Sequence, residues 1–162
     1  MTLDNAGIER LYRSHGHIVV RRARLLLGSE PDAQEALQEV FASLLRAPQS
    51  LRSGGSVVAW LYQATTHFCL NQLRNRRTGA RLLEGRIAPA LSTVAGAGAE
   101  ALAELRRLLA QMPTQVAAAA VHHHLDGMTH AEVAELLGCS RRQVGYLLAR
   151  AQRSLARLEE SA

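Results

Sequence analysis

Arginines along one helix are the residues of this chain with the clearest chemistry. A guanidinium group presents parallel N–H donors that match phosphate oxygens and the edge of a guanine base. Within residues 128–153, where the pattern predicts two helices joined by a tight turn, the second helix carries four of them: Arg141, Arg142, Arg150 and Arg153. This placement is typical of a helix whose start enters the major groove of DNA and whose flank meets phosphates.

Capping residues specify the turn between these two helices. Thr129 and Ser140 stand where each helix begins, with Glu132 and Gln143 three residues further on, which is the reciprocal capping pattern. Gly138 suits the left-handed position that ends the first helix. Apolar residues at helical spacing supply a shared core: Val133, Leu136, Val144, Leu147, Leu148 and Ala151. We expect a helix-turn-helix, and an αα-hairpin without DNA affinity is the alternative.

A second group of arginines lies at the end of the helix expected over residues 57–81. Arg74, Arg77 and Arg81 recur on one side of it, with Arg76 beside them. Their charge suits the negative end of the helix dipole and equally suits phosphates. Earlier on the same helix lie Trp60, Tyr62 and Phe68, for which two interpretations exist. In one, Trp60 or Tyr62 holds an unstacked base of a single strand. In the other, Trp60 and Phe68 pack in the core. The sequence leaves both alternatives open.

Charge is distributed unevenly along the chain. Its net charge is +5, and all 19 basic residues are arginine. Residues 1–86 hold 12 arginines against 7 acidic residues, whereas residues 87–162 hold 7 of each. The N-terminal half should therefore provide most of the long-range attraction to DNA.

The remaining chemistry argues against an enzyme, a metal or a cofactor. His122, His123 and His124 are consecutive, so on a helix they point about 100° apart and do not converge on one ion. No nucleophile elbow, phosphate-binding glycine loop or acid pair stands out. Cys69 and Cys139 are expected to be buried thiols in a reducing compartment, and the N-terminus lacks a signal peptide, so a cytoplasmic location is expected.

Helical periodicity predicts an all-α protein. Its 162 residues, 48% of them hydrophobic, suit two small soluble domains. Helices are expected over residues 3–27, from Ser29 or Asp32 to a stop at Pro48, and over residues 57–81, followed by four short helices that end the chain. Residues expected to be buried on the second helix are Leu37, Phe41, Leu44 and Leu45. Spacing places Val57, Leu61, Ala64 and Phe68 on one face of the third helix.

The domain boundaries follow from a change in composition. Residues 82–99 mix Gly, Ala, Ser and Pro without periodicity, which predicts a flexible linker. We therefore expect a helical domain over residues 1–81 and a helix-turn-helix domain over residues 100–162. An extended linker of that length spans about 65 Å.

Set together, these segments resemble the bacterial RNA polymerase sigma factors of the extracytoplasmic-function (ECF) type over nearly the whole chain. Residues 32–41, DAQEALQEVF, match the D-A-x-x-x-x-Q-E-x-F pattern of the segment that binds the polymerase clamp. Residues 59–78, AWLYQATTHFCLNQLRNRRT, resemble the segment that melts and reads the −10 element. Residues 124–155 resemble the reader of the −35 element.

The resemblance implies three sets of contact residues and no catalytic or metal site. Polymerase would bind Asp32, Glu35, Gln38, Glu39 and Phe41. The −10 element would contact Trp60, Tyr62, Asn71, Arg74, Arg76 and Arg77. The −35 element would contact Arg141, Arg142, Gln143, Gly145, Tyr146, Arg150 and Arg153. Core RNA polymerase and promoter DNA would be the partners, with an anti-sigma factor as a further one, and the loop over residues 48–56 would receive a flipped −10 base.

Departures from the family pattern keep other functions open. Gln34-Glu35 replace two acidic residues, Gly145-Tyr146-Leu147 replace a basic and polar run, and residues 117–120 are four alanines where bulkier side chains are usual. The runner-up function is a stand-alone helix-turn-helix regulator that binds DNA without polymerase. A third is an interaction protein whose recognition helix no longer binds DNA.

Overall fold

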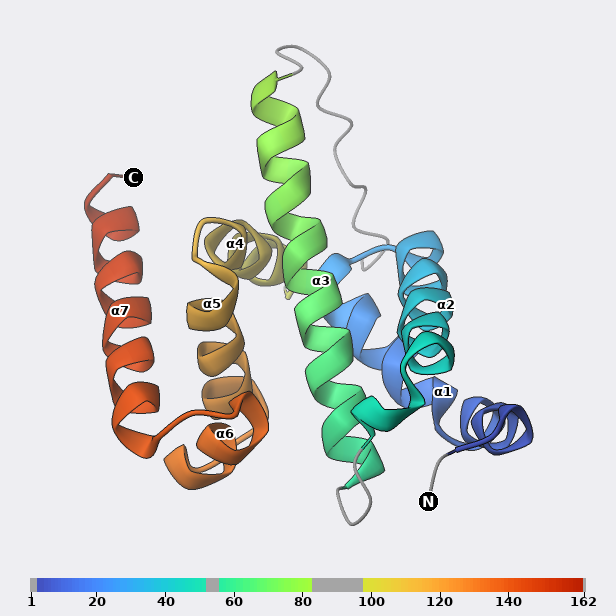
Figure 1. Cartoon of the computed structure of the whole chain (residues 1–162). Coiled ribbons are helices and arrows are strands. Elements are labelled where there is room, and N and C mark those ends of the chain that lie inside the picture. Colours follow the sequence, from blue (N-terminus) through green and yellow to red (C-terminus); the bar gives the residue numbers. More distant parts are fainter. Residues whose placement is uncertain (1–2, 52–55, 83–97, 162) are drawn as a thin grey trace. The chain divides into compact units, whose positions relative to one another are not determined.

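The computed structural model describes residues 3–51, 56–82 and 98–161 (Figure 1). Within these ranges the chain is helical and contains no strand, which confirms the all-α prediction. The elements are α1 (Asn5–Leu27), α2 (Glu30–Arg46), a 3₁₀ turn η1 (Pro48–Ser50), α3 (Val57–Leu82), α4 (Ala99–Ala110), α5 (Thr114–Ala120), a π-helical turn η2 (Val121–Leu125), α6 (His130–Leu137) and α7 (Arg141–Glu160).

Contacts group the chain into two compact units, and the division falls inside α3, between Cys69 and Leu70. The expected linker over residues 82–99 lies mostly outside the described residues, which resume at Gly98. Its predicted end residues are helical, since Leu82 ends α3 and Ala99 begins α4. The predicted domain boundaries therefore stay a prediction.

Local signals set the ends of α1 and α2. The carboxylate of Asp4 accepts from the Gly7 N–H at 2.7 Å and caps the start of α1. Gly28 ends α1 with φ 72°, a left-handed conformation that glycine adopts without a Cβ clash. Ser29, rather than the alternative Asp32, then caps α2. As expected, α2 stops just before Pro48.

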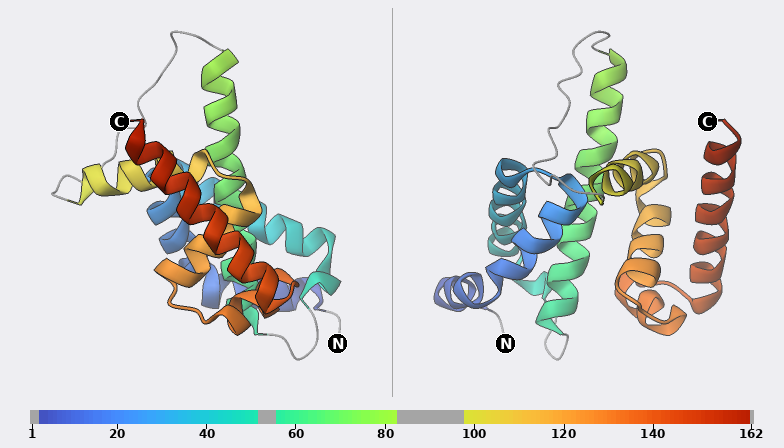
Figure 2. Two further views of the ribbon diagram at one scale, coloured as in Figure 1. Left: turned by 90° about the vertical axis from the view of Figure 1, so that its left-hand side faces the viewer. Right: turned by 180° about the vertical axis from the view of Figure 1, so that it is seen from behind.

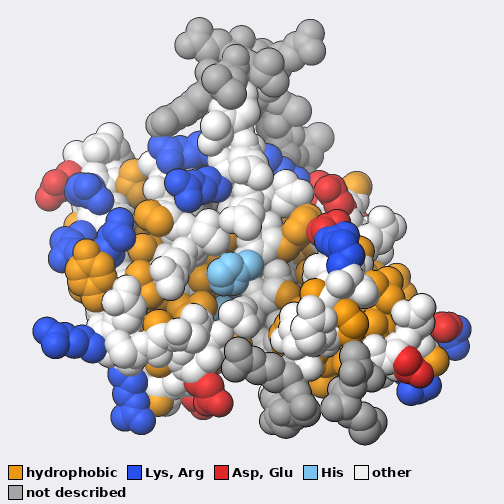
Figure 3. Space-filling view, in the orientation of Figure 1, with side chains coloured by type: hydrophobic (Ala, Val, Ile, Leu, Met, Phe, Trp, Pro, Cys, Tyr) orange, Lys and Arg blue, Asp and Glu red, His pale blue; other side chains and the backbone are white. Residues whose placement is uncertain are grey.

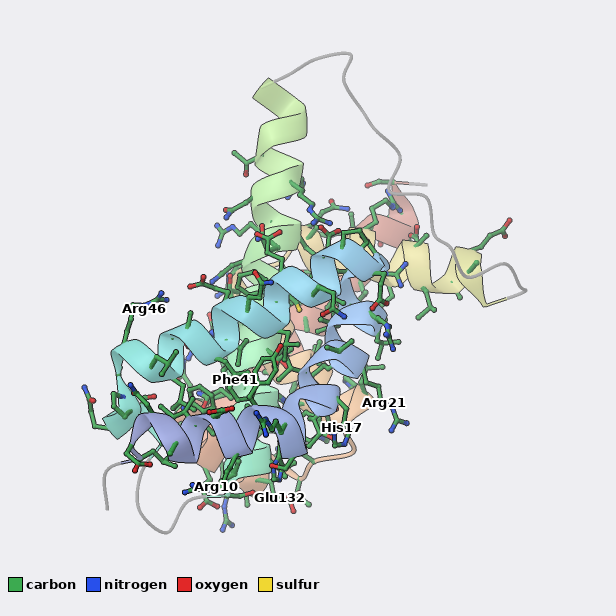
Figure 4. All side chains as sticks on the ribbon, turned by 90° about the vertical axis from the view of Figure 1, so that its right-hand side faces the viewer. Arg10, His17, Arg21, Phe41, Arg46 and Glu132 are labelled. Carbon is green, nitrogen blue, oxygen red and sulfur yellow. The ribbon has the colours of Figure 1, made fainter. Side chains whose placement is uncertain are left out.

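The first core lies between α1 and α2, which pack side by side (Figure 4). Figure 4 also shows α1 changing direction close to His17. At the neighbouring Gly16 the two helices lie close together, because an added Cβ would lie 3.3 Å from the Leu37 side chain. Core residues with at most 2% exposure are Val19, Ala23, Leu26, Leu27, Ala33, Ala36, Val40 and Leu44.

One prediction of a buried side chain was wrong. Leu45 is 50% exposed, because Leu44 takes the core position and the next residue lies about 100° further round α2. On α3 the fully buried side chains include Leu61, Thr65 and Cys69, whereas Val57, Ala64 and Phe68 are only partly buried. The buried face of α3 therefore differs from the stripe of apolar residues selected by spacing, because it includes two polar residues, Thr65 and Thr66.

An ion pair joins the end of α1 to the start of α2. Arg24 Nη2 donates to Glu30 Oε1 at 2.9 Å, and a second bond runs from Arg24 Nε to the other carboxylate oxygen. Arg24, helped by the amide of Gln34, lowers the pKa of the Glu30 carboxyl to about 2. The pair is exposed, so solvent screens it.

This pKa gives a pH dependence with a definite sign. Between pH 4.5 and about 2 the unfolded chain binds a proton at Glu30 that the folded chain does not. We therefore expect the free energy of unfolding of the wild type to fall as the pH is lowered through this window. The Glu30→Gln variant should lack the part of this fall that Glu30 causes, and should lose as much stability as the wild type from the other acidic groups. Urea unfolding at a series of pH values measures the difference, and parallel curves for the two proteins would contradict it.

The C-terminal unit is built around α5, α6 and α7, and Figure 2 shows α5 lying alongside α7. Thr129 and Glu132 form the predicted capping box at the start of α6, and Gly138 ends that helix with φ 68°. Ser140 caps α7 by accepting from the Gln143 N–H at 3.0 Å. These findings confirm the helix-turn-helix. Its core, together with α5, consists of Val116, Ala117, Ala118, Ala119, Val133, Ala134, Val144, Leu147 and Ala151.

The three consecutive histidines all lie within the π-helical turn η2. His122 is fully buried and its Nδ1 bonds to Asp126 at 2.9 Å, while His123 Nδ1 donates to the Met128 carbonyl at 2.7 Å. Among the described residues no cluster of three or more His, Cys, Asp or Glu is arranged to hold a metal ion. Within the same ranges, no helix is long and apolar enough to cross a membrane.

The two cysteines are free thiols. Cys69 is buried, as expected, but Cys139 is partly exposed. The prediction for Cys139 was wrong because this residue lies in the turn between α6 and α7, where the chain leaves the helix core at Gly138.

Candidate nucleic-acid interface

One side of α7 carries exposed polar side chains and the other carries the core. Val144, Leu147 and Ala151 are at most 3% exposed and face the helices of the same unit. The predicted contact residues that are exposed lie on the remaining surface: Arg141, Arg142, Gln143, Tyr146, Arg150 and Arg153. Figure 3 shows arginines gathered over α7, along the left edge of the view.

The start of α7 has an unfavourable charge for a free helix. Arg141 and Arg142 occupy its first turn, which holds no acidic residue. Positive charges at this end oppose the helix dipole, whereas an anion there is stabilised. A phosphate placed between the N-terminal N–H groups and these guanidinium groups would relieve the repulsion. The charge of the first turn of α7 is therefore compatible with the predicted contact to an anionic partner.

Gly145 and Tyr146 form the middle of this surface. Tyr146 is 55% exposed, the most exposed of the large apolar side chains among the described residues. A Cβ added to Gly145 would meet no heavy atom within 4 Å in the described part of the chain. The glycine is therefore not required by packing within this unit.

The second arginine group lies near the end of α3. Asn71, Arg74 and Arg76 are exposed, and Arg77 is partly exposed. The side chain of Arg81 lies outside the described residues. Because Arg74 and Arg77 are three residues apart, they share one side of the helix, with Arg76 next to them.

Trp60 and Tyr62 lie more than three helical turns before these arginines and are both half-buried. An open hollow of about 260 Å³ is lined by Trp60, Gln63, Ala64 and His67. Tyr62 lies on another side of α3, with the guanidinium carbon of Arg22 4.8 Å from its ring centroid. Neither Trp60 nor Tyr62 is fully buried, so part of each residue remains accessible to a partner.

The predicted polymerase-binding residues lie on α2. Glu35, Gln38 and Glu39 are exposed, and Asp32 is partly buried. Glu39 pairs with Arg46 at 2.6 Å. Phe41 differs from the others, because it is 4% exposed and its ring packs edge-on against Tyr12, with the centroids 5.1 Å apart. Phe41 supports this surface from the core.

Sequence reasoning missed Arg22, a buried arginine that contacts two residues of α3. A signal was present. Residue 22 lies three positions after Val19 and four before Leu26, so helical spacing alone places it on the core side of α1. The pairing of His122 with Asp126 was missed too, although the two residues are four apart on one helical turn.

Comparisons with known proteins agree with this geometry. Residues 11–78 match the family Sigma-70 region 2, and residues 102–155 match the family Sigma-70, region 4. The ECF RNA polymerase sigma factor SigM of Mycobacterium tuberculosis is 30% identical over 155 residues, which are 96% of this chain and 78% of that protein. The ECF RNA polymerase sigma factor SigE of Mycolicibacterium smegmatis is 34% identical over 68 residues, which are 42% of this chain and 26% of that protein.

Solved structures share the fold. CnrH, in complex with the cytosolic domain of CnrY, has a TM-score of 0.57 at 23% identity and covers 98% of this chain and 90% of that chain. The sigma factor RpoE of Bartonella quintana, in complex with the anti-sigma factor NepR, has a TM-score of 0.54 at 16% identity, with 94% of this chain and 96% of that chain covered. The helices and the matched regions define a transcription factor of the sigma-70 class. Within that class, this chain belongs to the ECF RNA polymerase sigma factors.

Proposed function

We propose that this chain binds core RNA polymerase and directs it to promoters, with α3 contacting the −10 element and α7 contacting the −35 element. The observation that carries the proposal is the pair of arginine-bearing helix surfaces, one on each of the two regions that match the family. The chain contributes binding and strand separation, while polymerase forms the phosphodiester bond. It acts with polymerase in the cytoplasm.

The exposed side of α2 is the surface proposed for polymerase. Glu35, Gln38 and Glu39 supply an acidic and amide face whose backbone is held rigid by the α1–α2 core. An anti-sigma factor is a further proposed partner, by analogy with the RpoE complex. The domains over residues 1–81 and 100–162 are proposed to contact the two promoter elements separately.

Polymerase dependence separates this function from the runner-up. A purified chain that acts as proposed is retained by core polymerase and gives run-off transcripts from a promoter fragment. A stand-alone regulator binds duplex DNA without polymerase and gives none. A chain whose α7 surface no longer binds DNA is captured by protein partners, does not bind duplex DNA and gives no run-off transcripts.

The arginine group of α3 gives a quantitative test. Replacing Arg74, Arg76 and Arg77 together by Ala is expected to weaken the promoter complex and to flatten its salt dependence. Each lost phosphate contact removes about 0.7 to 0.9 from the slope of log affinity against log salt concentration. The measurement is promoter binding by reconstituted holoenzyme at a series of salt concentrations.

The control is the matched substitution of Arg10, Arg13 and Arg21, exposed arginines of α1 that are not assigned to DNA. That control should leave the slope unchanged. A slope that does not change in the α3 variant would exclude this arginine group from the DNA interface.

A further inference from the structure

The N-terminal unit contains a buried positive charge. Arg22 is 8% exposed and lies on α1 next to Ala23, which is fully buried, and three residues after Val19, which is also fully buried. Burying a guanidinium group costs free energy unless its N–H groups are hydrogen-bonded and its charge interacts favourably with neighbouring groups. An apolar residue would pack at this position without that cost, so the presence of an arginine indicates a specific structural or functional role.

Two residues of α3 contact this guanidinium group. Arg22 Nε donates to Thr66 Oγ1 at 2.6 Å, and the guanidinium carbon lies 4.8 Å from the centroid of the Tyr62 ring. Tyr62 and Thr66 are four residues apart, so they share one side of α3. One side chain of α1 thus holds α3 at two points one turn apart.

The two contacts require an arginine. A planar guanidinium donates from Nε in its own plane while its face lies against an aromatic ring, whereas a lysine ammonium has no such plane. Thr66 is fully buried, so its hydroxyl serves Arg22 and is not available to a ligand. Tyr62 is only half-buried, so part of this residue stays accessible to a partner.

We propose that Arg22 is a positioning residue for promoter opening, which fixes the Tyr62 ring in the orientation that receives an unstacked base of the −10 strand. The proposal rests on the assignment of Tyr62 to the −10 element made above. A ring held against a guanidinium face loses little further freedom when a base stacks on it, so more of the stacking free energy is available to stabilise the open strand.

Adjacent threonines provide the variant and its matched control. Thr66→Val removes the acceptor for Arg22 while nearly preserving shape. Thr65→Val makes the same change one residue earlier, at a fully buried hydroxyl that has no hydrogen-bond partner among the described residues. Thr66→Ser keeps the acceptor and is the conservative rescue. Melting temperature and core-polymerase binding are measured for each, at an assay temperature where all are folded.

Opening is measured with holoenzyme on a promoter fragment selected by that holoenzyme from a random duplex library, with 2-aminopurine in the −10 region. Thr66→Val is expected to open the duplex about tenfold more slowly, the scale of one weakened base–aromatic stack. Thr65→Val and Thr66→Ser are expected to open it like the wild type. In a Tyr62→Ala background, Thr66→Val should cause no further slowing, because its effect acts through that ring.

Three results would overturn the inference. If Thr66→Val slows opening equally with and without Tyr62, Arg22 acts through general stability. If Thr66→Val opens DNA as fast as Thr65→Val, the bond to Arg22 has no role in opening. If Tyr62→Ala alone leaves opening unchanged, the assignment of Tyr62 to the −10 strand also fails. The Tyr62→Ala variant therefore tests the proposed contact of Tyr62 with DNA separately from the proposed role of Arg22.

Discussion

Replacing Phe41 by Ala is expected to lower the free energy of unfolding by about 3–5 kcal/mol. The side chain is 4% exposed on α2, and its ring meets Tyr12 edge-on at an interplanar angle of 73°. Truncation leaves a cavity between α1 and α2 and removes an aromatic pair worth about 0.5–1.5 kcal/mol beyond its buried area. Because total stability is typically about 5–15 kcal/mol, this loss is a large fraction of it. Urea unfolding of the purified chain, followed by circular dichroism, measures it.

The same position tests how α2 binds polymerase. Phe41→Leu keeps an apolar side chain in the core and should cost less stability than the alanine variant. Gln38→Ala removes an exposed amide and should change stability by no more than about 0.5 kcal/mol. In a pull-down with core polymerase we expect Gln38→Ala to weaken binding and folded Phe41→Leu to retain it. A folded Phe41→Leu protein that does not bind would assign the phenylalanine ring to the interface.

Phe41 illustrates a limit of motif-based prediction. A family pattern marks positions but does not say whether a side chain touches a partner or holds the surface that does. Spacing gives the missing information here, because Phe41 lies four residues after Leu37 and three before Leu44, both buried. The motif predicted the helix and its function, while the helical period indicated the core role of this residue.

Local signals were sufficient for the helix ends. The Thr129 capping box, the left-handed Gly138 and the Ser140 cap each depend on residues within a few positions of one another. Their geometry is therefore readable from a single sequence. The helix-turn-helix and most of the helix boundaries followed from such signals.

Non-local partners were not readable in this way. The bond between Arg22 and Thr66 joins residues 44 positions apart. Burial of Thr65 and Thr66 rotates the inner face of α3 away from the apolar stripe that periodicity selects. A polar side chain can be buried when its partner lies on another helix, and only the packed structure supplies that partner.

Introducing arginine at Gly145 is expected to raise both the stability of the chain and its affinity for the −35 element. Glycine inside a helix costs about 1 kcal/mol relative to alanine, and arginine is nearly as good a helix former as alanine. The site has room, since an added Cβ meets no heavy atom within 4 Å among the described residues. An arginine there lies near Arg141 and Arg142 and can bind a phosphate or a guanine edge, the latter worth about 1–3 kcal/mol when bidentate.

Gly145→Ala separates the two contributions, because it restores helix propensity without adding a charged donor. Both variants should melt at a higher temperature than the wild type, and only Gly145→Arg should bind a promoter fragment more tightly as holoenzyme. The opposing account is that the glycine lets α7 approach the DNA backbone closely, so that any side chain clashes with the duplex. In that case both variants gain stability and lose promoter affinity, with alanine already showing the loss. That result would make Gly145 a fitted contact with DNA, whereas tighter binding by the arginine variant alone identifies the glycine as an interruption in an otherwise basic recognition surface.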